Sequence, residues 1–77
     1  MKQPNMSVTL VAGVYQTWQA IAPDCGDCDN ATAVELVLDA DRMKDYAPGA
    51  YKEMMAEVKA HGYSAVHKRL CKVVNLV

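Results

Sequence analysis

The chain has 77 residues, of which 52% are hydrophobic and 22% are charged, and its net charge at neutral pH is −1. This length suits one domain with a small core, and the hydrophobic content argues against intrinsic disorder. A nearly neutral net charge excludes a strongly basic nucleic-acid coat protein, and three cysteines exclude a secreted disulfide scaffold. We therefore expect a single soluble domain in the cytoplasm, with no membrane partner.

The first element can be interpreted as a helix or as a strand. Residues 1–6 are expected to form a flexible arm. Apolar residues recur at helical spacing over residues 7–22, which favours an amphipathic helix capped by Ser7. The polar side of that helix would carry Thr9, Gly13, Gln16 and Thr17. Alternating apolar and β-branched residues over 8–18 leave a strand as the alternative.

A loop rich in cysteine and aspartate is predicted over residues 23–30 (PDCGDCDN). Thr32 and Glu35 then match a capping box, in which the hydroxyl and the carboxylate each bond an unpaired backbone amide. This pattern predicts a helix from Thr32 to about Ala47. The alternative is a short strand over 34–38, which could pair with 8–18 in an α+β fold.

The last part of the chain predicts two helices joined by a turn at Gly62 and Tyr63. Pro48 suits the first turn of a helix that ends at His61, because its missing N–H is not needed there. Gly62 suits the left-handed position that ends a helix, and Ser64 suits the cap of a helix running to Leu76. We expect a mainly α fold, a bundle of three to four short helices with a helix-turn-helix-like C-terminal pair.

Charge is unevenly distributed along the chain. Residues 23–47 contain seven acidic and two basic residues, whereas five basic and two acidic residues follow from Pro48 onward. An acidic lobe of this kind would meet a basic surface on a protein partner. We therefore expect a non-enzymatic interaction protein that blocks or adapts a larger macromolecule, as small inhibitors encoded by phages and mobile elements do. Its expected partner-binding residues are Asp24, Asp27, Asp29, Asp39, Asp41 and Asp45.

The basic C-terminal helix supports an alternative function, a helix-turn-helix regulator that binds DNA. Arginine, lysine and asparagine are the side chains that contact phosphates and base edges. The expected nucleic-acid-binding residues are His67, Lys68, Arg69, Lys72 and Asn75.

A zinc site is the one cofactor that the residue pattern suggests. A C-x2-C turn and an i,i+4 histidine–cysteine pair can supply four tetrahedral ligands. The predicted set is Cys25, Cys28, His67 and Cys71. No nucleophile elbow, P-loop or dinucleotide fingerprint is present, so no catalytic residue is expected. A homodimer is an alternative to a different protein partner, because small domains often gain stability by association.

Overall fold

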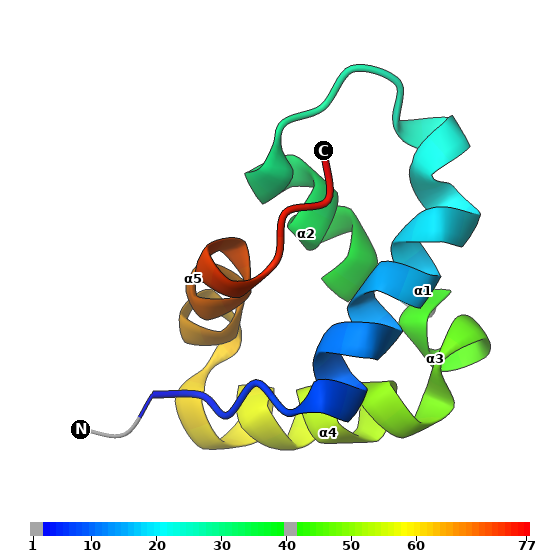
Figure 1. Ribbon diagram of the computed structural model, residues 1–77. Helices are drawn as coiled ribbons and strands as arrows, with labels where there is room; N and C mark the ends of the chain where they lie inside the picture. Colours follow the sequence, from blue (N-terminus) through cyan, green and yellow to red (C-terminus); the bar gives the residue numbers. More distant parts are fainter. Residues whose placement is uncertain (1–2, 40–41) are drawn as a thin grey trace.

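The computed structural model describes residues 3–39 and 42–77, without the side chains of residues 23–25. Five helices and no strand are present in this part of the chain (Figure 1). The helices are α1 (Val8–Cys25), α2 (Asn30–Leu38), α3 (Arg42–Tyr46), α4 (Pro48–His61) and α5 (Tyr63–Val73). The fold is therefore mainly α, as predicted, and the α+β alternative is wrong. Within these ranges no helix combines the length and the hydropathy that crossing a bilayer requires.

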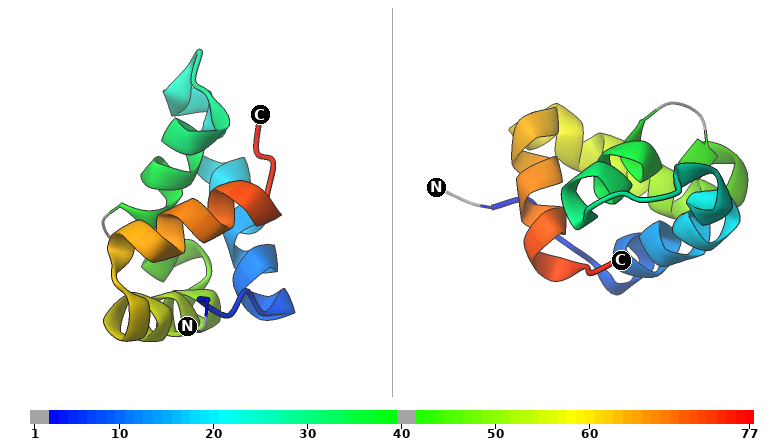
Figure 2. Two further views of the ribbon diagram at one scale, coloured as in Figure 1. Left: turned by 90° about the vertical axis from the view of Figure 1, so that its left-hand side faces the viewer. Right: turned by 90° about the horizontal axis from the view of Figure 1, so that it is seen from above.

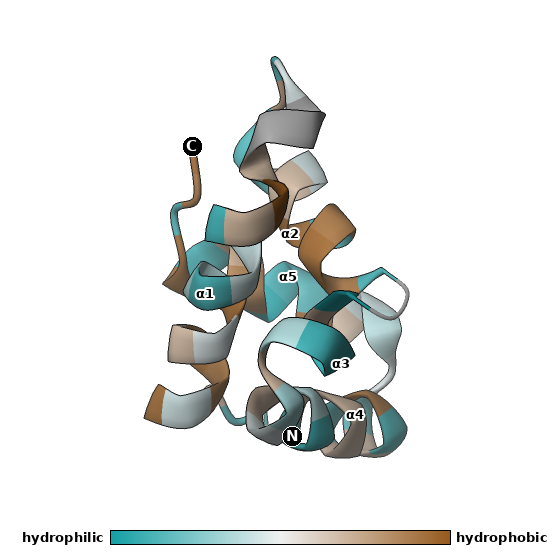
Figure 3. Cartoon of the chain, turned by 90° about the vertical axis from the view of Figure 1, so that its right-hand side faces the viewer, coloured by the Kyte–Doolittle hydropathy of each residue, from teal (hydrophilic) through white to brown (hydrophobic). Residues whose placement is uncertain are grey.

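The helices enclose one core. Helix α1 contacts α2, α3 and α4, while α5 contacts α2 and α4. Helix α4 lies across one end of the molecule, and the two views of Figure 2 place α2 between α1 and α5. The second half of α2 is strongly hydrophobic, in contrast to the polar α3 (Figure 3). The largest fully buried side chains are Leu10, Val14, Thr17, Val34, Val37, Met43, Val66 and Leu70.

Helix α1 confirms the helical interpretation of the first element. The Ser7 hydroxyl oxygen accepts a hydrogen bond from the Leu10 amide at 3.1 Å, so Ser7 is the N-cap. The predicted polar side is wrong at Gly13 and Thr17, which are both buried. Helix α4 packs there: a Cβ added at Gly13 would overlap the Cβ of Ala50. The predicted polar side was derived from the spacing of apolar residues within one helix, which assumes that only one side of the helix is buried. The contact with α4 buries a second side of α1.

Helix α2 begins and ends earlier than predicted. The side chain of Asp29 accepts a hydrogen bond from the Thr32 amide at 2.8 Å, so Asp29 caps a helix that starts at Asn30. The helix start predicted at Thr32 is therefore wrong. The predicted continuation to Ala47 is also wrong, because α2 stops at Leu38 and α3 is a separate five-residue helix.

The bounds of α4 are those predicted, with Pro48 in its first turn. Gly62 alone joins α4 to α5, and its φ of 92° is a conformation that side chains with a Cβ rarely adopt. Helix α5 starts at Tyr63 and ends at Val73, so the predicted cap at Ser64 and the predicted end are wrong. A one-residue connection is shorter than the three to four residues typical of DNA-binding helix-turn-helix units.

Candidate anion-binding groove

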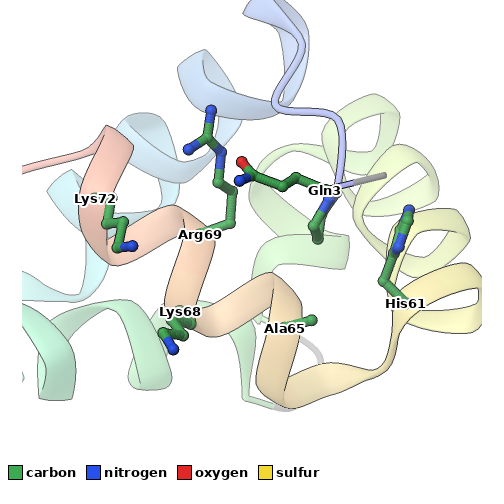
Figure 4. A pocket seen from close by; sticks show the side chains of 7 residues that line it. Gln3, His61, Ala65, Lys68, Arg69 and Lys72 are labelled. Carbon is green, nitrogen blue, oxygen red and sulfur yellow. The ribbon is translucent and has the colours of Figure 1, made fainter. Parts of the chain in front are cut away.

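Three basic side chains of α5 line a groove of about 540 Å³ on the molecular surface (Figure 4). The end of α4 and the segment formed by residues 3–7 supply its other walls. The groove is lined by Gln3, Pro4, His61, Ala65, Lys68, Arg69 and Lys72. No carboxylate is among these lining residues, so positive charge is not neutralised within the groove itself.

Helical spacing places the cations on one side of α5. Val66 and Leu70 are fully buried in the core. Lys68 and Lys72 are four residues apart, which puts them on the same face of the helix, and both are exposed. Arg69 precedes Lys72 by one turn and is half-buried. The exposed face of α5 thus carries two lysines, with the half-buried Arg69 beside it, and the three cations lie within about 6 Å of helix length.

The segment of residues 3–7 is held in place by two carboxylates of α4. The Asn5 amide donates a hydrogen bond to Glu57 Oε1 at 2.7 Å, and the Ser7 hydroxyl donates to Glu53 Oε1 at 2.6 Å. Pro4 is buried. The part of the expected flexible arm that the structure describes, residues 3–6, therefore packs against the helices and forms a wall of the groove.

The two acidic residues of α4 do not line the groove, but one of them lies beside a lining residue. Glu53 and Glu57 are the only acidic residues after Pro48 in the sequence. Both accept hydrogen bonds from the segment of residues 3–7, and Glu57 Oε1 also lies 3.7 Å from His61 Nε2. Because a carboxylate keeps its negative charge when it accepts a hydrogen bond from an uncharged group, Glu57 puts one negative charge beside His61 at the α4 end of the groove, while Lys68, Arg69 and Lys72 make the α5 wall positive.

Arg69 has an unmet hydrogen-bonding requirement. Its Nε is buried and has no hydrogen-bond partner among the described residues. A guanidinium carries five N–H donors and stays charged at all ordinary pH values. The side chain of Gln3 extends toward Arg69 across the groove (Figure 4).

The predicted acidic residues occupy several places. Asp29 caps the start of α2, and hydrogen bonds from the Thr32 side chain and amide lower the pKa of its carboxyl. Asp39 is at the other end of α2, about 13 Å away for nine helical residues. Asp27 lies in the connection before α2 and Asp45 lies in α3, and both are exposed. Asp41 and the side chain of Asp24 lie outside the described residues. The described aspartates are therefore distributed over the start of α2, its end and α3.

His67 and Cys71 lie on the α2 side of α5, away from the groove lining. His67 Nε2 donates a hydrogen bond to the Ala31 carbonyl oxygen at 2.9 Å, and its ring stacks on Tyr63 with the centroids 6.2 Å apart. The Cys71 sulfur is 3.8 Å from His67 Nε2. Burial, and secondarily the charge of Asp29, raises the pKa of the Cys71 thiol. This pair therefore holds a protonated thiol, not an activated thiolate.

The predicted zinc set is only partly within the described residues. Cys28 is disulfide-bonded, and the side chain of Cys25 is outside the description. The described side chains include no group of three histidine, cysteine or acidic residues that could hold a metal ion. A disulfide sulfur is not a thiolate ligand. The zinc site thus stays a prediction, and it applies to the reduced protein.

Of the five residues predicted to bind nucleic acid, the structure brings together Lys68, Arg69 and Lys72. Asn75 follows α5, does not line the groove, and its backbone amide donates to the Tyr15 hydroxyl at 3.2 Å. Sequence reasoning missed Gln3, Pro4, His61 and Ala65, since only long-range packing brings residues 3–7 beside α5.

Comparison of the chain with protein-family models, with curated proteins and with solved structures finds no match.

Proposed function

We propose that the protein is a non-enzymatic binding protein that contacts the phosphate backbone of DNA through its α5 groove. The observation that carries the proposal is that Lys68, Arg69 and Lys72 all line one groove whose lining contains no carboxylate. Lysine and arginine contacts to phosphates supply most of the affinity in sequence-independent DNA binding. By binding the phosphate backbone of DNA, the protein would block or adapt other proteins that use the same DNA.

The chemistry of the groove favours contact with phosphates over the reading of bases. No phenylalanine, tyrosine or tryptophan is among its lining residues, so it offers no platform of the kind on which unpaired bases stack. Asn75, the candidate for reading adenine, is not in the groove.

The arrangement gives less support to a protein partner held by the aspartates. Asp29 already accepts the amide hydrogen bond that caps the start of α2, and Asp39 lies at the other end of that helix. A contact surface that used both would need to extend over the length of α2. In contrast, the three cations that line the groove lie within about one and a half turns of α5.

The test is fluorescence anisotropy of a labelled 20-base-pair DNA duplex, titrated with the protein at several salt concentrations. Three phosphate contacts predict a slope of about −2.7 in log K against log salt, or about 40-fold weaker binding at 200 mM than at 50 mM salt. The Lys68→Glu/Lys72→Glu variant should lower the affinity and reduce the slope to about −0.9.

The matched control is Lys52→Glu/Lys59→Glu, which changes the net charge equally at two exposed positions of α4 outside the groove. It should bind nearly as the wild type does. Circular dichroism checks that both variants stay helical. The proposal fails if the wild type does not bind at 50 mM salt with about 100 µM protein, the weak end of non-specific binding. It also fails if the two double variants lose affinity equally.

A further inference from the structure

We infer that the groove contains a discrete phosphate site at Arg69, in which the edge formed by Nε and one terminal nitrogen binds two oxygens of a single phosphate group. The inference deepens the proposed function and rests on it, because it names the residue that would hold one backbone phosphate in a fixed position. A groove that attracts DNA only through its net potential would need no such site.

The Nε–H of Arg69 has no hydrogen-bond acceptor in the described part of the chain. Buried polar groups in folded proteins nearly always have a hydrogen-bond partner, and an exception calls for an explanation. Arg69 Nε is buried, so this group is such an exception. The inference requires the half-buried side chain to rotate so that this edge faces the groove, where a phosphate oxygen would supply the missing acceptor.

Gln3 lies beside the Arg69 guanidinium, toward which it extends an amide that can donate to an oxygen (Figure 4). Lys72, one turn further along α5, adds a positive charge to the groove lining, although its ammonium group points away from the guanidinium. Pro4 and Ala65 contribute apolar walls. Less water beside the guanidinium strengthens a charge-assisted hydrogen bond.

Arginine suits two-point binding of a phosphate, and lysine does not. The planar fork of a guanidinium matches two oxygens of a phosphate, whereas an ammonium acts as a point charge. The chemistry that fits the site is therefore a phosphate group, carried either by DNA or by free phosphate. The two sources are separate arms of the experiment below.

The experiment is an NMR titration of the wild-type protein with inorganic phosphate at constant ionic strength, with sodium chloride as the matched titrant. The Nε–H signal of the Arg69 side chain should shift and saturate, with a dissociation constant below about 10 mM. Arg69→Lys keeps the charge and should weaken phosphate binding at least about tenfold by losing the second hydrogen bond. Arg42→Lys, the same change on α3, should leave it unaltered.

Shifts that grow linearly, or that chloride reproduces, overturn the inference, as does equal phosphate binding by Arg69→Lys. Because the wild-type titration needs no variant, the inference stays testable if Arg69→Lys misfolds. The DNA duplex forms the second arm. Salt-dependent DNA binding without saturable phosphate binding refutes the Arg69 site alone, whereas saturable phosphate binding without DNA binding refutes the proposed function.

Discussion

Replacement of Gly13 by alanine tests the closest helix contact in the fold. Gly13 and Gly49 both lie in helices and neither has a positive φ, so alanine fits both backbones. A Cβ at Gly13 would overlap the Cβ of Ala50 and lie 3.2 Å from the Cβ of Ala47, whereas a Cβ at Gly49 meets no atom within 4 Å. The two substitutions are chemically identical and differ in what the added methyl group contacts.

The expected changes in the free energy of unfolding, relative to the wild type, have opposite signs for the two variants. Alanine in a helix is favoured over glycine by about 1 kcal/mol, which both variants gain in part. At Gly13 the methyl group forces α1 and α4 apart, and overpacking of this kind costs about 3 kcal/mol at the upper end of its usual range. We expect Gly13→Ala to lower stability by about 2 kcal/mol, since the cost exceeds the gain. Gly49→Ala should raise stability by about 0.5 kcal/mol.

Thermal and urea unfolding followed by circular dichroism measure both effects. For a chain of this size, Gly13→Ala should lower the melting temperature by roughly 10 °C and Gly49→Ala should raise it by roughly 3 °C. Adding Ala50→Gly to the Gly13→Ala variant should reduce the cost of the alanine, because it removes the overlapping methyl group. If Gly13→Ala is as stable as the wild type, α1 and α4 do not pack as described.

Three further predictions concern the elements that meet at the start of α2. Asn30→Ala removes three side-chain hydrogen bonds, two to the carbonyl oxygens of Cys71 and Val74 and one from the Leu76 amide. The free energy of unfolding should fall by about 1–3 kcal/mol. The backbone amide of Leu76 should exchange its hydrogen faster. Unchanged exchange would refute this tether. Asp29→Ala should destabilise the protein at pH 7. Because the pKa of the Asp29 carboxyl is lowered from 3.8 in the folded state, its stabilisation is present above that value and declines as pH falls through the folded pKa. Urea unfolding should therefore find a smaller difference from the wild type at pH 2.5 than at pH 7, and a constant difference would contradict the assigned cap. The raised pKa of Cys71 predicts alkylation by iodoacetamide at pH 7.5 that is slower in the folded protein than in urea, as followed by mass spectrometry. Equal rates would show that the thiol is not shielded.

Helices with local signals were predictable from the sequence. Pro48 marks the start of α4 through its fixed φ and missing N–H, and Gly62 marks the end through its freedom to adopt a positive φ; both effects are local, and both bounds are confirmed. The start of α2 was misjudged because Asp29 and Thr32 are both good caps, and only the observed hydrogen bond distinguishes them. The ends of α1 and α5 depend on tertiary packing, which a periodic pattern does not contain.

The groove was predictable only in part. The spacing of Lys68, Arg69 and Lys72 on one helix was sufficient to place them on one face. Gln3 and Pro4 belong to a segment that is over 60 residues away in sequence and reaches α5 because Asn5 bonds Glu57. No local pattern encodes that contact. The distribution of the aspartates over the start of α2, its end and α3 likewise depends on where the helices begin and end.

The most direct test of the proposed function is an amide NMR titration of the wild-type protein with an unlabelled DNA duplex at low salt. DNA contact through the groove predicts that the largest shifts cluster at Gln3, Ala65, Lys68, Arg69 and Lys72, and that they diminish as salt is added. Shifts that centre on the residues around Asp27 or Asp45, or no shifts at DNA concentrations of about 100 µM, would contradict it.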